Sequence, residues 1–219
     1  MRLLLLANAV TALSFSPRLQ KFLGGGHDND ASTSRLGERP ELPGGTPLSL
    51  CKESSPADLF NVSWVEVTKQ PLYMDDEFYI NIYGTFQGTK TWTENATLTW
   101  TVDCGSHCEM YGYPPGETGS ASMDFNFCEL HDIMQPIGRH KRNATCPPAD
   151  GWALATTFMW ISPWLLGGSP GWYNATLDAR TADGRRIYCL TAEVCLRWED
   201  SSKEEKYPKG PWSNCTWPR

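Results

Sequence analysis

One string in the sequence has the residue types of a nucleophilic catalyst. Residues 167–171, Gly-Gly-Ser-Pro-Gly, fit the G-x-S-x-G pattern in which a serine attacks an acyl group. That mechanism needs an oxyanion N–H from the residue after the serine, and Pro170 has no N–H. The string therefore favours a Gly/Pro loop before a strand, and we predict that the chain is not an enzyme.

A second group has the residue types of a metal site. Cys104, His107 and Cys108 lie within five positions, with His131 further along. Thiols oxidise in secreted proteins, and tetrahedral zinc needs a fourth ligand that this spacing does not supply. A small disulfide loop is the better interpretation, and we expect no metal and no cofactor.

A third group, Glu129, His131 and Asp132, offers acid and base groups. Adjacent charged residues after a strand are typical of a solvated turn, so we assign no catalytic residue. The basic residues 139–142, with Arg180, Arg185 and Arg186, fit either solvated loops or attraction to anionic lipid head groups.

Composition limits the partners. The 219 residues are 40% hydrophobic and 20% charged, enough for one domain, and the net charge of −6 argues against nucleic acid. Residues 1–16 resemble a signal peptide, and residues 17–46 read as a propeptide or flexible leader. No later segment reaches about 18 uninterrupted apolar residues, so we expect no membrane anchor.

The secretory route agrees with the cysteines and glycosylation sequons. Eight cysteines predict four disulfides in an oxidising compartment: secreted, or the lumen of a vacuole or lysosome. The sequons are Asn61, Asn95, Asn143, Asn174 and Asn214.

The segment from Gly171 to Leu196 predicts a β-hairpin. Asp183-Gly184 favours a type I′ turn, since both central residues of that turn need positive φ. A glycan on Asn174 must face solvent, which places Tyr173, Ala175, Leu177 and Ala179 inward.

The remaining strands come from the same alternation of apolar and polar residues. They are expected near residues 59–67 (with a bulge at 63–64), 78–86, 95–102, 123–127 and 152–161. About seven short strands predict an all-β sandwich of two antiparallel sheets over residues 47–198. Residues 199–219 are expected to form a charged, Trp-rich tail pinned back by Cys215.

Large apolar side chains on the inward faces form the remaining candidate binding site. Periodicity alone does not distinguish a filled core from a lined cavity. The residues are Phe78, Ile80, Ile82, Leu98, Trp100, Phe125, Phe127, Phe158, Trp160, Tyr173, Leu177, Leu190 and Val194.

An ordered set of short motifs resembles the ML lipid-recognition family, and most of all its fungal phosphatidylglycerol/phosphatidylinositol transfer proteins, relatives of the Niemann-Pick type C sterol carrier. The motifs are Gly45-Thr46-Pro47-Leu48 with Cys51, Phe127-Cys128-Glu129-Leu130, Cys146-Pro147-Pro148, Pro170-Gly171-Trp172-Tyr173 and Ile187-Tyr188-Cys189-Leu190. The resemblance covers roughly residues 47–196.

The resemblance implies an immunoglobulin-like sandwich whose two sheets splay to hold a lipid between them. It also implies the disulfides Cys51–Cys189 and Cys128–Cys146. Cys104, Cys108, Cys195 and Cys215 depart from the family pattern. Local Cys104–Cys108 and strand-to-tail Cys195–Cys215 pairs are preferred, although four cysteines allow three pairings.

The function expected from this resemblance is non-enzymatic lipid transport. The chain would be a monomer that takes up a phospholipid (phosphatidylglycerol or phosphatidylinositol) or a sterol and touches membrane surfaces transiently. The alternative is a secreted, glycosylated adhesion or receptor-binding sandwich with a solid core.

Overall fold

The computed structural model describes residues 42–92, 95–103, 120–137, 140–143, 145–163, 170–205 and 215. The described residues belong to one compact unit. The predicted signal peptide, the leader up to residue 41, Cys104, Cys108 and the Asn214 sequon lie outside the described residues.

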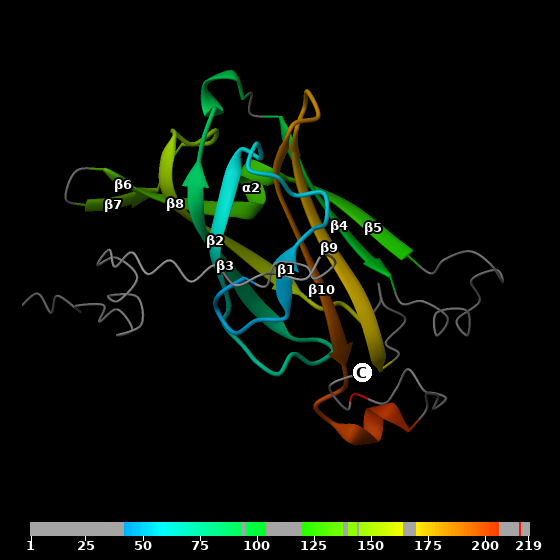
Figure 1. Cartoon of the computed structure of the whole chain (residues 1–219). Helices are drawn as coiled ribbons and strands as arrows, with labels where there is room; N and C mark the ends of the chain where they lie inside the picture. The colour runs from blue at the N-terminus through cyan, green and yellow to red at the C-terminus, as the bar shows by residue number, and fades with distance from the viewer. Residues whose placement is uncertain are drawn as a thin grey trace, which may run out of the picture. The chain divides into compact units, whose positions relative to one another are not determined.

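Two antiparallel sheets form the domain, which confirms the predicted all-β sandwich (Figure 1). Sheet A contains, in spatial order, β1 (Leu48–Leu50), β10 (Arg186–Leu196), β9 (Gly171–Thr181), β4 (Ala96–Asp103) and β5 (Ser120–Asn126). Sheet B contains β2 (Phe60–Val67), β3 (Glu77–Phe86), β8 (Gly151–Trp160), β6 (His131–Ile137) and β7 (His140–Asn143). The described residues thus form more strands than the seven expected. The short helices are η1 (Thr89–Thr91), α2 (Phe127–Leu130) and η3 (Ser201–Glu204).

The alternation seen in the sequence places the predicted faces correctly in most strands. In β3, Phe78, Ile80 and Ile82 are buried while Tyr79 is exposed. In β2 the pairing with β3 shifts between Val62 and Trp64, which confirms the predicted bulge. In β9, the Asn174 side chain is exposed and Tyr173 and Leu177 are buried, as the sequon required.

The hairpin between β9 and β10 is present, but the predicted type I′ turn is wrong. Gly184 donates to the Thr181 carbonyl at 2.9 Å and has a φ of 83°, whereas Asp183 is not at positive φ. Ala182 and Asp183 are therefore the central residues of a type I-like turn, and Gly184 takes the left-handed position after it. Thr181 and Arg185 both bond to the Asp183 carboxylate, which holds that residue in place.

Only one turn residue should therefore need a left-handed backbone. We expect Gly184→Ala to lower the free energy of unfolding by about 1 kcal/mol, because φ is positive there although a Cβ would meet no other atom. Gly184→Asn should cost less, since asparagine tolerates this conformation. Urea denaturation of both variants tests this, and an alanine variant as stable as the wild type would contradict the turn geometry.

One end of the sandwich is filled with aromatic rings. Phe60 stacks on Phe86 with ring centres 4.2 Å apart, and Phe127 lies 5.4 Å from Trp92 and 6.1 Å from Tyr188. These residues come from the beginnings of β2 and β10, the end of β3 and the segments after β3 and β5. At their opposite ends, β2 and β10 carry aliphatic side chains such as Val67 and Leu196, so the two ends of the interior differ in packing.

Disulfides link distant parts of the fold. Cys51–Cys189 and Cys128–Cys146 agree with the pairs that the resemblance implied, and Cys195–Cys215 confirms the preferred strand-to-tail pair. Disulfides of this kind are typical of extracellular or lumenal proteins.

Residues 42–46, which precede the expected start of the domain at residue 47, contact the sandwich. Leu42 is buried in the core, and the Pro43 carbonyl accepts a hydrogen bond from the Val65 N–H at 3.1 Å. Residues 42–46 therefore belong with the sandwich, because an apolar side chain and a backbone bond fix them to β2.

Candidate functional site: an apolar pocket between the sheets

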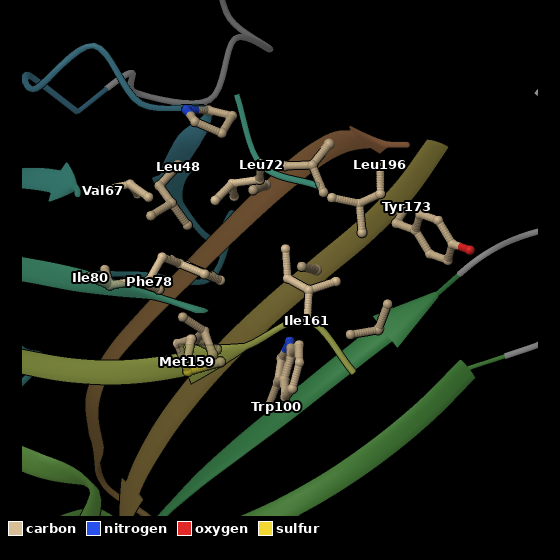
Figure 2. Close-up of a pocket in the computed structure, with 16 residues that line it drawn as sticks. Leu48, Val67, Leu72, Phe78, Ile80, Trp100, Met159, Ile161, Tyr173 and Leu196 are labelled. Carbon is tan, nitrogen blue, oxygen red and sulfur yellow. The ribbon is translucent and has the colours of Figure 1, made fainter. Parts of the chain in front are cut away.

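A pocket opens between the two sheets at the end opposite the aromatic cluster (Figure 2). None of the described residues that line it is charged. Its cavity volume is about 70 Å³. Sheet A and the segment before it contribute Pro47, Leu48, Trp100, Val102, Tyr173, Ala175, Leu177, Ala192, Val194 and Leu196, and sheet B with its connecting segments contributes Val67, Leu72, Phe78, Ile80, Met159 and Ile161.

Two small side chains in the centre of sheet A account for the space. Ala192 of β10 pairs with Ala175 of β9, and their outer neighbours across the sheet are Leu48 and Val102. All four line the pocket. Because the two central positions carry only a methyl group each, the facing side chains of sheet B have nothing bulky to meet there.

The segment between β2 and β3 closes one side of the pocket. Met74 donates to the Arg197 carbonyl at 2.7 Å, and Asp75 donates to the Ile161 carbonyl at 2.9 Å. Arg197 follows β10 of sheet A and Ile161 follows β8 of sheet B, so this segment fastens the two sheets to each other. It also carries Leu72 into the pocket lining.

Six of the predicted lipid-binding residues line this pocket: Phe78, Ile80, Trp100, Tyr173, Leu177 and Val194. Four others point inward but are buried outside the pocket lining: Ile82, Leu98, Phe127 and Leu190. Phe125, on the edge strand β5, is half-buried and does not line the pocket. The interior thus contains both a filled core and a lined cavity.

The prediction that Phe158 and Trp160 point inward is wrong. They are 44% and 42% exposed, and they pair with Tyr79 and Glu77 on the outer face of sheet B. The inward residues of β8 are instead Ala153, Ala155, Thr157 and Met159, all buried. At the end of β8 the larger apolar side chains face solvent and the smaller ones face inward. The prediction therefore assigned the wrong set of alternating residues to the inner face.

Comparison with known proteins assigns no family to this chain. No family model matches the chain, and a search of curated proteins found no match. The site must therefore be interpreted from its own geometry. No helix among the described residues is long and apolar enough to cross a membrane.

His131 differs from the solvated turn expected of it. Glu129 and Asp132 are exposed, but the His131 side chain is buried and stacks on Phe127 with ring centres 4.1 Å apart. Its Nδ1 lies 3.0 Å from the Phe127 carbonyl and its Nε2 lies 2.8 Å from the Tyr188 hydroxyl. A carbonyl only accepts, so Nδ1 carries the proton and Nε2 accepts from Tyr188. Burial lowers the pKa of His131 to about 4, against a smaller opposing effect of the Phe127 carbonyl.

The other sequence candidates for chemistry lie mostly outside the described residues. β9 begins at Gly171, so the G-x-S-x-G string leads into a strand, whereas a nucleophile elbow leads into a helix. Ser169 itself, and Cys104, His107 and Cys108, lie outside the described residues.

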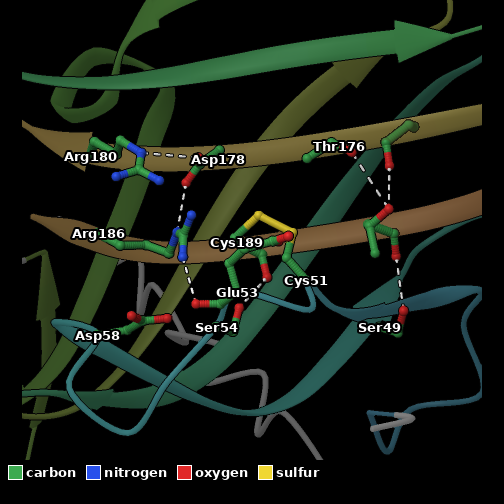
Figure 3. Close-up of a disulfide and its surroundings, with 12 residues drawn as sticks. Ser49, Cys51, Glu53, Ser54, Asp58, Thr176, Asp178, Arg180, Arg186 and Cys189 are labelled. Atoms are coloured by element: carbon green, nitrogen blue, oxygen red, sulfur yellow. Dashed lines mark hydrogen bonds and ion pairs between the residues drawn. A yellow bond between two sulfur atoms is a disulfide. The ribbon is translucent and has the colours of Figure 1, made fainter. Parts of the chain in front are cut away.

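The arginines near the hairpin are paired with carboxylates. Asp178 accepts from Arg180 at 3.0 Å and from Arg186 at 3.1 Å (Figure 3). Arg185 bonds to Asp183 at 2.9 Å. Two carboxylates therefore balance part of the charge of the three arginines, which weakens the case for these arginines as a site for anionic head groups.

Proposed function

We propose that this chain is a lipid carrier of the secretory pathway that holds an apolar chain between its sheets and moves it between membranes without covalent chemistry. The observation that carries the proposal is the pocket between the sheets, whose described lining residues include no charged side chain. The resemblance of the sequence to the ML lipid-recognition family supports the same function. Phospholipids and sterols are the ligands that this resemblance implies.

The free energies involved suit a carrier. Removing about 10 methylenes from water at about 0.8 kcal/mol each contributes about 8 kcal/mol, which corresponds to about micromolar affinity. A bilayer offers the chain a similarly apolar environment, so the protein does not compete by affinity. It instead lowers the barrier to crossing water between two membranes.

The pocket must widen to accept a lipid. Its volume of about 70 Å³ is smaller than the roughly 150 Å³ apolar cavity that admits benzene in another protein. The segment carrying Leu72 and the open ends of the strands are the parts that border the space. Cys51–Cys189 and Cys195–Cys215 both attach to β10, so they hold the segment after β1 and the tail against sheet A.

Lipid transfer between vesicles tests the proposal. Pyrene-labelled phosphatidylglycerol, phosphatidylinositol and a fluorescent sterol are placed in donor vesicles, and their appearance in acceptor vesicles is followed with and without the protein. In parallel, an organic extract of the natively expressed protein is analysed by mass spectrometry. Faster transfer and a co-purified lipid are expected, whereas a clean extract with unchanged transfer of all three probes would overturn the proposal.

One observation favours the alternative of a secreted adhesion or receptor-binding protein. Tyr79, Phe158 and Trp160 form an exposed aromatic group on the outer face of sheet B, with the Tyr79 and Phe158 rings 5.5 Å apart. Exposed apolar groups of this kind often mark protein interaction sites. A protein that carries no lipid but loses partner binding with Phe158→Ser would support this alternative.

A further inference from the structure

Trp100 differs from the other residues that line the pocket, because it brings a hydrogen-bond donor. In Figure 2 its ring stands on β4 and its nitrogen is at the end turned toward Ile161, among the lining side chains. Within the part of the chain that the structure describes, this N–H has no hydrogen-bond partner. Trp100 is half-buried, so the unpaired donor lies at the boundary of an apolar space.

No other described lining side chain offers a comparable polar group. Among the described lining residues, only Tyr173 also has an N–H or O–H in its side chain, and its hydroxyl points away from the labelled lining residues in Figure 2. Two further unpaired polar atoms among the described residues, Trp92 Nε1 and Thr157 Oγ1, are buried in residues that do not line the pocket. From the described lining, a ligand therefore meets one donor and no charged group.

The single hydrogen-bond donor in the described lining determines which polar group of a ligand can be paired there. An indole N–H donates and does not accept, so its best partner is an oxygen that only accepts. A carbonyl or ester oxygen meets this requirement, whereas a hydroxyl would bring an O–H with no side-chain acceptor and leave it unpaired. A charged group placed in this lining would lose its hydration without a compensating partner.

We propose that the pocket selects acyl lipids and that the Trp100 N–H donates to the ester carbonyl at the start of the bound chain. This inference rests on the proposed lipid-carrier function and decides between its two ligand classes, in favour of acyl esters over sterols. The charged head group stays outside the lining, and the acyl chain beyond the carbonyl lies against Leu177, Ala192 and Phe78.

Three nine-carbon probes test this assignment: 2-nonanone, 1-nonanol and nonane. Each is titrated into the ¹⁵N-labelled protein and its dissociation constant is read from the spectra. For Trp100→Phe, binding of 2-nonanone should weaken about three- to tenfold, the size of one net hydrogen bond, while binding of nonane should change less than twofold. In the wild type, the Trp100 indole N–H signal should move downfield with 2-nonanone and not with nonane.

Trp92→Phe is the matched control, because it removes an unpaired indole N–H that is buried away from the pocket. It should leave all three affinities unchanged. If Trp100→Phe weakens ketone and alkane equally, or weakens neither, the donor role is wrong while the pocket remains a lipid site. A larger effect on 1-nonanol than on 2-nonanone would replace the acyl ester with a hydroxyl ligand. If no probe binds to the wild type, the lipid-carrier function itself fails.

Discussion

Ala192→Leu should lower lipid binding and transfer more than tenfold while leaving the fold nearly as stable as the wild type. Ala192 lines the pocket and is 5% exposed, so three added carbon atoms enter the empty space. If they exclude two methylenes of the ligand, the loss at about 0.8 kcal/mol each is about 1.6 kcal/mol, or more than tenfold in affinity. Vesicle transfer and urea denaturation measure the two properties separately.

Ala179→Leu is the matched control in the same strand pair. Ala179 lies on the same inner face as Ala175 but is fully buried and does not line the pocket. Overpacking there should lower the free energy of unfolding by about 1–3 kcal/mol without changing transfer by the folded protein. The opposite pattern, in which Ala192→Leu destabilises the fold as much as Ala179→Leu and leaves transfer intact, would mean that the space at Ala192 does not serve ligand binding.

The faces of β4 and β9 could be predicted from sequence because a physical marker fixed them. Asn95 and Asn174 begin sequons, and both side chains are exposed in the structure. β8 contains no such marker and has apolar residues at both parities, from Ala153 to Trp160. Side-chain size was then the remaining guide, and it failed because this end of sheet B carries Phe158 and Trp160 on its outer face.

The pairing that creates the pocket follows from the hairpin even though the predicted turn was wrong. A two-residue turn at Asp183-Gly184 would pair Ala182 with Arg185, and therefore Ala175 with Ala192. The observed turn shifts the pairing by one residue, but the irregularity between Arg186 and Tyr188 restores it, and Ala175 does face Ala192. The size of the resulting gap depends on how sheet B packs above it, which alternation within a strand does not encode.

The sequence also failed to predict the environment of His131. Its charged neighbours Glu129 and Asp132 indicated a solvated turn, and both are exposed. The short helix α2, capped by Asn126, instead turns the chain so that His131 begins β6 facing inward. Its hydrogen-bond partner Tyr188 lies 57 positions away, a separation over which local sequence carries no signal.

His131 should make the protein less stable as the pH falls from 6.5 to 4. In the unfolded chain its pKa takes the ordinary value of 6.5, and burial lowers it to about 4 in the folded protein. Between these values the unfolded state binds the proton and the folded state does not, so stability falls with falling pH. At 1.36 kcal/mol for each pKa unit, the loss by pH 4 is about 3 kcal/mol.

The double variant His131→Phe/Tyr188→Phe should remove this part of the pH dependence. Replacing both partners leaves no buried polar group unpaired, because the Phe127 carbonyl still accepts the backbone N–H of residue 131. Unfolding free energies of the two proteins at pH 7, 5.5 and 4 provide the measurement. The two proteins carry the same exposed carboxylates, so these contribute equally to the pH dependence of both. Between pH 7 and pH 4, the free energy of unfolding of the wild type should therefore fall by about 3 kcal/mol more than that of the variant. Equal losses would show that His131 takes up its proton in the folded protein as readily as in the unfolded chain.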